Sequence, residues 1–139
     1  MATNTQFSIA VHLMVGLGYQ AGGDITSARL AESVNASPSF VRRTLAKLSK
    51  ADLIHTATGK AGACWLARNP REISLLDIYR AVEAPKAFAI HHYSAQKCCP
   101  VSCKIKTALE SVLGQTQNAL EASLAKSTLA GVIANLKQA

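Results

Sequence analysis

Three cysteines close together are the residues of this 139-residue chain whose type and spacing suggest chemistry. Cys98 and Cys99 are adjacent, and Cys103 follows after a short Pro-Val-Ser stretch. A cysteine thiolate can be oxidised to a sulfenic acid or a disulfide, and it is also a metal ligand. The N-terminal segment has no basic leader before its apolar stretch, so we expect no signal peptide. A cytoplasmic location would keep these thiols reduced.

A second informative group of residues is basic. The chain carries 15 Lys and Arg against 8 Asp and Glu, a net charge of +7, which favours a polyanionic partner. Residues 25–70 include seven basic and two acidic residues, so about a third of the chain carries a net charge of +5. The basic residues of this segment are Arg29, Arg42, Arg43, Lys47, Lys50, Lys60 and Arg68. Clustered cations are what contact with a nucleic-acid backbone requires, so we expect double-stranded DNA as the partner.

The elements around these cations predict a winged helix-turn-helix. A short helix after Thr26 or Ser27 ends at Asn35-Ala36, and Ser37-Pro38 has the residue types that start a second helix. The second helix has an apolar stripe at helical spacing, and its opposite stripe is basic. Residues 53–58 and 64–67 then predict two strands joined by a glycine-containing connection, which would form the wing.

The second helix and the wing supply the candidate DNA contacts. A serine near the start of this helix can donate to a phosphate or to a base edge, and its arginines can do either, including pairing with guanine through two hydrogen bonds. Lys47 and Lys60 are expected to contact phosphates. The full candidate set is Ser37, Ser39, Phe40, Arg42, Arg43, Lys47, Thr58 and Lys60.

Further helices are expected on both sides of this motif. A first helix covers about residues 5–19, and Ser74 with Asp77 three residues later predicts the start of another helix. From Pro100 a long helix of about 24 residues would reach roughly 36 Å, more than its own domain needs, which favours dimerisation. The prediction is a mainly α protein with a small β-hairpin: a DNA-binding domain over 1–84, then a sensor loop and dimerisation helices over 85–139.

Sequence motifs around the wing support this prediction. The segment Leu66-Ala67-Arg68-Asn69-Pro70-Arg71-Glu72-Ile73-Ser74-Leu75-Leu76-Asp77-Ile78-Tyr79-Arg80-Ala81-Val82-Glu83 closely resembles the Rrf-two family of bacterial winged helix-turn-helix transcription regulators. The resemblance extends over nearly the whole chain. It implies a homodimer, held by the long helix and bound to palindromic promoter DNA, and we expect a repressor.

The cysteines depart from part of that family. Its iron–sulfur and nitric-oxide-sensing members hold a cluster with three cysteines at five-residue gaps, whereas here two of the three are adjacent. The chain is thus nearer a branch without that pattern, and no cofactor is expected. Four interpretations stay open for Cys98, Cys99 and Cys103: a redox-sensing thiol switch, an iron–sulfur cluster completed by His91 or His92, a zinc site with those histidines, or plain packing. Cys64, on the wing strand, is expected to pack.

Other function classes find less support in the sequence. An apolar content of 49% excludes a disordered chain, and no apolar run is long enough to span a membrane. A thiol peroxidase using Cys99 with Cys103 is an alternative, but no phosphate loop, nucleophile elbow or metal motif accompanies it, so we do not expect an enzyme. A DNA-binding adaptor without any sensing function is a further alternative.

Overall fold

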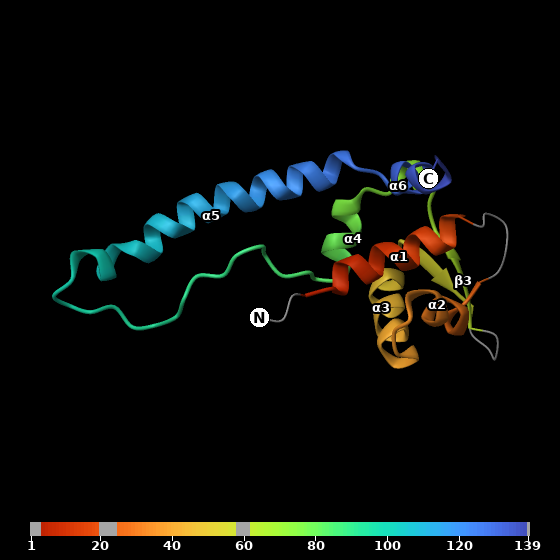
Figure 1. The fold of residues 1–139 in the computed structure, drawn as a ribbon, viewed down its shortest axis with the longest axis horizontal. Coiled ribbons are helices and arrows are strands. Elements are labelled where there is room, and N and C mark those ends of the chain that lie inside the picture. Colours follow the sequence, from red (N-terminus) through yellow and green to blue (C-terminus); the bar gives the residue numbers. More distant parts are fainter. Residues whose placement is uncertain (1–3, 20–24, 58–61, 139) are drawn as a thin grey trace. The chain divides into compact units, whose positions relative to one another are not determined.

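The computed structural model describes residues 4–19, 25–57 and 62–138, and it divides into two compact units. The first unit combines Met1–Ala84 with Leu124–Ala139, and the second is Pro85–Ser123. The elements are α1 (Gln6–Tyr19), β1 (Ile25–Thr26), α2 (Ser27–Val34), α3 (Pro38–Lys50), β2 (Ile54–Thr56), β3 (Ala63–Leu66), the 3-10 helix η1 (Pro70–Glu72), α4 (Leu75–Ala81), α5 (Pro100–Lys126) and α6 (Leu129–Gln138) (Figure 1).

The sheet has three antiparallel strands in the order β1-β3-β2, one more than the hairpin predicted from sequence. The hairpin itself is confirmed, with Ile54 opposite Leu66 and Thr56 opposite Cys64. The added strand β1 pairs Ile25 with Cys64 on the other edge of β3. Two residues are too few to give an alternating pattern, which is why the sequence did not predict this strand.

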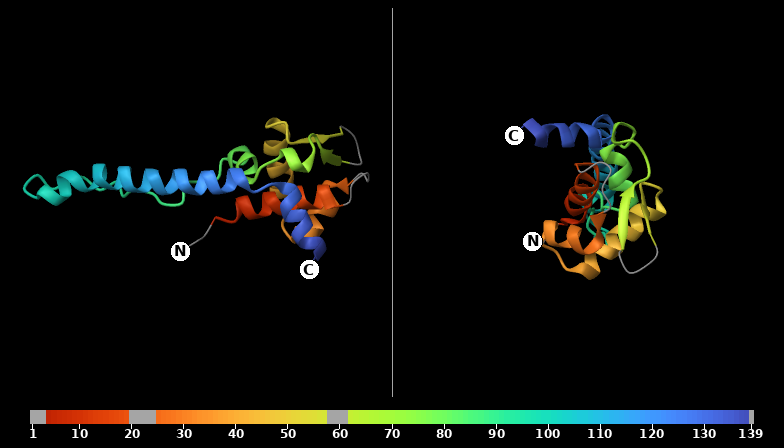
Figure 2. Two further views of the ribbon diagram at one scale, coloured as in Figure 1. Left: turned by 90° about the horizontal axis from the view of Figure 1, so that it is seen from above. Right: turned by 90° about the vertical axis from the view of Figure 1, so that its right-hand side faces the viewer.

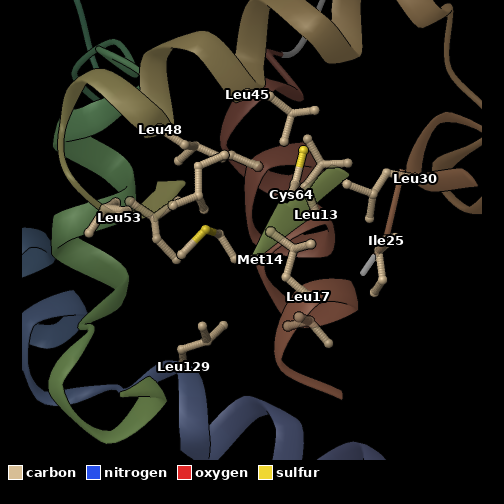
Figure 3. Close-up of a cluster of buried hydrophobic side chains, with 14 of the residues drawn as sticks. Leu13, Met14, Leu17, Ile25, Leu30, Leu45, Leu48, Leu53, Cys64 and Leu129 are labelled. Carbon is tan, nitrogen blue, oxygen red and sulfur yellow. The ribbon is translucent and has the colours of Figure 1, made fainter. Parts of the chain in front are cut away.

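One hydrophobic core holds the first unit together. Leu13, Met14 and Leu17 of α1 are buried with residues of α3 and β3 (Figure 3). Cys64 is 2% exposed and belongs to this core, as its position on the wing strand predicted. Burying such side chains stabilises the fold by roughly 1.5–3 kcal/mol each, so this core determines how α3 and the sheet are placed.

The first unit ends at Ala84, where the sequence analysis placed a boundary, but it also includes helix α6, which the sequence analysis grouped with residues 85–139. Leu129 and Ile133 are buried in the same core as α1, and α6 lies against α1 (Figure 2). The helices approach closely at Gly18, where an added Cβ would lie 2.5 Å from Cδ1 of Ile133. The sequence predicted dimerisation helices over residues 85–139, and it did not show that the apolar face of the last one enters this core.

The second unit consists of residues 85–99 and most of α5. The helix is 27 residues long, and Gln117 is its one buried residue in the described chain. The Gln117 side chain accepts a hydrogen bond from the backbone N–H of Ala87 at 3.0 Å, which fixes the start of the preceding segment to the helix. No helix in the described part of the chain combines the length and apolarity needed to cross a bilayer.

Candidate nucleic-acid interface and cysteine cluster

The turn between α2 and α3 is fixed by local capping. Thr26 accepts the N–H of Arg29 at the start of α2, and Asn35 ends the helix in the left-handed conformation with φ 61°. Asparagine tolerates that conformation better than most residues. Ser37 then caps α3 by accepting the N–H of Phe40 at 3.2 Å, with Pro38 in the first turn. The predicted helix-turn-helix is therefore present, and its two helices start and end where the capping residues lie.

Helix α3 has one face in the core and one exposed face. Val41, Thr44, Leu45 and Leu48 are buried. The exposed positions on the same helix include candidate DNA contacts, while Phe40 and Lys47 are half-buried. The candidates that the structure leaves fully accessible are Ser37, Ser39, Arg42 and Arg43.

Phe40 contacts the guanidinium of a candidate base-reading residue. The guanidinium carbon of Arg43 lies 5.8 Å from the centroid of the Phe40 ring, within range of a cation–π interaction. The hydroxyl of Thr44 donates to the carbonyl of Phe40 at 3.1 Å, one turn further on. The ring of Phe40 therefore offers the exposed Arg43 side chain a favourable position along α3.

The wing carries an exposed pair that the sequence analysis did not single out. His55 of β2 and Trp65 of β3 are cross-strand partners, with ring centroids 6.0 Å apart. Both are exposed, and each directly follows a buried residue, Ile54 and Cys64 respectively. Neither strand alternates regularly between buried and exposed residues, so no period-two pattern in the sequence pointed to this pair. The predicted contacts Thr58 and Lys60 lie outside the described residues.

The predicted sensor cysteines gather at the start of α5. Cys98 and Cys103 are exposed and Cys99, which directly precedes α5, is half-buried. The Cys99 sulfur accepts the N–H of Ser102 at 3.4 Å, and the Cys103 thiol donates to the carbonyl of Gln96 at 3.6 Å. The hydrogen bonds therefore connect Cys99 to the backbone of the first turn of α5 and Cys103 to the backbone of the segment before the helix.

The histidines of the same segment lie apart from these contacts. His91 and His92 are exposed, and the ring of His91 packs near Tyr93 with centroids 6.1 Å apart. Cys64, by contrast, is buried, and desolvation raises the pKa of its thiol above the ordinary value. Its sulfur donates to the carbonyl of Gly62 at 3.5 Å.

Comparison with known proteins shows which family has this arrangement. Residues 3–135 match the model of the Rrf2 family, described as an iron-dependent transcriptional regulator. YwnA of Bacillus subtilis (strain 168), assigned to the HTH-type transcriptional regulators, is 35% identical over 136 residues, which cover 96% of this chain and 98% of YwnA. A crystal structure attributed to a DNA-binding protein is 34% identical, with a TM-score of 0.74 over 92% of this chain and 98% of the other.

A more distant structure shares the fold alone. CymR (YrzC), the global cysteine regulator of B. subtilis, is 19% identical with a TM-score of 0.71, covering 97% of this chain and 98% of CymR.

The family description names iron, and the cysteine segment is the place to test whether the residues fit it. Among the residues that the structure describes, no group of three or more His, Cys, Asp or Glu side chains is arranged to hold a metal ion. Cys98 and Cys99 are adjacent, and the Cys99 sulfur is directed to a backbone N–H. These residues do not fit an iron–sulfur or zinc site in this conformation.

Proposed function

Because this chain belongs to the Rrf2 family of transcriptional regulators, we propose that it is a repressor that binds two-fold symmetric promoter DNA as a homodimer. The observation that carries the proposal is the outer face of α3. There Ser39, Arg42 and Arg43 are exposed on a helix whose opposite face is buried in the core. A helix held in this way can enter the major groove with its polar face toward the bases.

The geometry of α3 supports the roles that we propose for its individual residues. Arg43, beside the Phe40 ring, is proposed to pair with a guanine, and Arg42 to contact a base or a phosphate. Ser37 and Ser39 lie at the helix start, where hydroxyl and backbone N–H groups suit phosphate oxygens. Lys47 is proposed to contact phosphate, as are Thr58 and Lys60, which lie in the sequence between β2 and β3.

The dimer is proposed to form along α5. Val101 and Val112 are 67% and 58% exposed, and the remaining apolar residues of the helix are at most half-buried. Exposed apolar area of this extent on one helix is commonly covered by a partner. A second copy of the same helix offers a self-complementary surface, and two-fold symmetry would then be imposed on the bound DNA.

Selection from a pool of random duplexes tests the DNA proposal. The purified chain should enrich a two-fold symmetric sequence, and sedimentation should show a dimer on it. The double variant Arg42→Ala/Arg43→Ala should lose this enrichment, while Arg71→Ala, an exposed arginine on η1, should keep it. Run-off transcription from a promoter carrying the enriched site should fall when the protein is added. Enrichment of an asymmetric site by a monomer would contradict the proposal, and so would rising transcription.

We further propose that Cys99 and Cys103 form a redox switch of this regulator. The Cys99 thiolate would attack a peroxide, breaking the O–O bond and forming a sulfenic acid while hydroxide leaves. The Cys103 thiol would then displace water from that sulfur, so that two thiols supply the two electrons that reduce the peroxide. The disulfide would require both sulfurs to leave their backbone partners Ser102 and Gln96. The first turn of α5 would then rearrange.

Peroxide treatment of matched cysteine variants tests the switch. The native chain and Cys98→Ser should lose the mass of two hydrogens and change their DNA affinity. Cys99→Ser and Cys103→Ser should do neither. Unchanged affinity in the oxidised native chain would leave DNA binding in place but contradict the switch.

A further inference from the structure

A groove in the first unit runs along α1 between α2 and α6. It encloses about 800 Å³, within the roughly 300–1,000 Å³ of small-molecule pockets. One stripe of α1 lines it, from Ser8 through His12 and Val15 to Tyr19. The other walls come from α2, β1 and α6, so the groove is separate from the exposed face of α3 and from the cysteine cluster.

The body of the groove is apolar. Val15 and Leu30 are buried at its base, and Val132 and Leu136 of α6 close one side. Leu136 is 49% exposed, and so is much of Tyr19, because both lie at the rim. Covering an apolar wall that is open to solvent with an apolar ligand removes both surfaces from water, which favours binding.

Polar groups gather on the α2 side. The Nε2 atom of His12 and the hydroxyl of Ser33 are 3.0 Å apart and hydrogen-bonded, which joins α1 to α2. Arg29 and Glu32 also line the groove from α2. Within residues 4–19, 25–57 and 62–138, the guanidinium of Arg29 forms no ion pair. A planar, permanently charged donor on an apolar groove suits a carboxylate, which it can hold by two parallel hydrogen bonds.

We propose that this groove binds a small aromatic or alicyclic molecule that carries one carboxylate. The apolar body would lie along α1 against Val15, Leu30 and Val132, and the carboxylate would pair with Arg29. Glu32 lies three residues after Arg29 on α2, and its carboxylate repels a bound anion. Direct hydrogen bonds from the Arg29 guanidinium therefore have to exceed this repulsion.

The position of the groove gives such a ligand a regulatory effect. Its walls include α2, the first helix of the helix-turn-helix, and α6, which follows α5 after only Ser127 and Thr128. A ligand bound there contacts both the DNA-binding motif and the element that leads back from α5. This regulatory consequence rests on the proposed function, whereas ligand binding itself does not.

The test uses a matched pair of probes on the full chain without DNA. Isothermal calorimetry compares 2-naphthoate, an aromatic carboxylate, with 2-naphthalenemethanol, which has the same ring system but no charge. Three variants are compared with the native chain: Arg29→Gln removes the cation, Glu32→Gln removes the opposing anion on the same helix, and Leu136→Trp fills the groove from its exposed rim. Circular dichroism and thermal unfolding confirm that each variant is folded.

The native chain should bind naphthoate more tightly than the alcohol. Arg29→Gln should weaken naphthoate binding about 10-fold or more, the range of a charge-assisted hydrogen bond. Glu32→Gln should leave it equal or tighter, and Leu136→Trp should abolish it. Three results would overturn the proposal: no naphthoate binding by the native chain, equal binding by folded Leu136→Trp, or equal binding of the two probes. DNA selection is unaffected by any of these results, so the site and the proposed function fail independently.

Discussion

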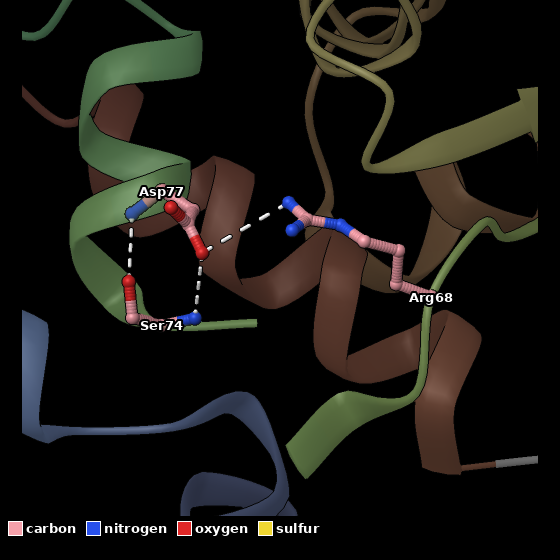
Figure 4. A network of polar contacts seen from close by, with 3 residues as sticks. All are labelled: Arg68, Ser74 and Asp77. Carbon is pink, nitrogen blue, oxygen red and sulfur yellow. Dashed lines mark hydrogen bonds and ion pairs between the residues drawn. The ribbon is translucent and has the colours of Figure 1, made fainter. Parts of the chain in front are cut away.

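The hydroxyl of Ser74 accepts the backbone N–H of Asp77 at 3.1 Å, while the Asp77 carboxylate accepts the N–H of Ser74 at 3.0 Å (Figure 4). This reciprocal capping box starts α4. The next backbone N–H, of Leu75, donates to the carbonyl of Ser127 at 2.8 Å. The capping box therefore also positions the backbone at Leu75, which forms a hydrogen bond with the segment just before α6.

Replacement of Ser74 by alanine should lower the free energy of unfolding by about 1 kcal/mol, the usual cost of losing a helix cap. Urea unfolding measures it. Arg68→Ala is the matched comparison, because its guanidinium lies 3.9 Å from the same Asp77 carboxylate in an ion pair about 40% exposed on both sides. Solvent screens such a pair, so its loss should change stability by less than about 0.5 kcal/mol. A larger loss in Arg68→Ala than in Ser74→Ala would contradict this assignment.

Replacement of Arg43 by alanine should weaken binding to the selected duplex by about 1–3 kcal/mol and relax specificity at one base pair. Fluorescence anisotropy on the site and on its single-base variants measures both effects. Lys50→Ala removes an exposed cation from the last turn of the same helix and should weaken all duplexes alike. If Arg43→Ala weakens binding to all duplexes equally, Arg43 contacts the phosphate backbone of the DNA and not a base.

The helix-turn-helix could be predicted from sequence because its signals are local. Ser37, Pro38 and the apolar stripe of α3 specify a helix start and a buried face within a few residues of each other. The same holds for Ser74 and Asp77 at α4. These features do not depend on distant parts of the chain, and the structure has them where the sequence placed them.

Contacts between distant segments could not be predicted in this way. Leu129 is in the core because it packs with α1, which lies more than a hundred residues earlier in the chain. The short apolar pattern of its own helix does not reveal this partner. The contact between Arg43 and Phe40 depends on rotamers, and the groove beside Arg29 depends on three helices at once. Spacing places Phe40 and Arg43 one helical turn apart, but it carries no information on the contact of Leu129 with α1 or on the groove.

Replacement of Leu129 by alanine should destabilise the first unit by about 2–5 kcal/mol, because the side chain is fully buried and leaves a cavity. Chemical unfolding measures the loss. Leu136→Ala, on the same helix but half-exposed, should cost clearly less. Equal losses would mean that α6 does not pack on α1 as described.

Burial should protect Cys64 from alkylation while the cysteines near α5 react. A short maleimide pulse followed by peptide mass spectrometry should label Cys98, Cys99 and Cys103 in the folded chain and Cys64 only in denaturant. Rapid labelling of Cys64 in the native state would contradict its place in the core.

The raised pKa of Cys64 also predicts a pH dependence. The folded chain keeps this proton over a range in which the unfolded chain has lost it. The resulting stabilisation is therefore complete below the pKa of an unfolded thiol and is lost as the pH rises through the folded pKa. Unfolding free energies of the native chain should thus fall more steeply on the alkaline side than those of Cys64→Ala. Parallel curves would contradict the prediction.

The return of α6 to the core of α1 has a consequence for synthesis. The chain leaves the first unit at Ala84 and re-enters it at Leu124, so residues made after the whole second unit are part of the core that supports the DNA-binding helices. A nascent chain that has exposed only the segment through Ala84 lacks Leu129 and Ile133, and its α1 is left with an uncovered apolar side. This DNA-binding unit therefore cannot complete its core until α6 has emerged from the ribosome, so its folding waits for the synthesis of α5 and α6.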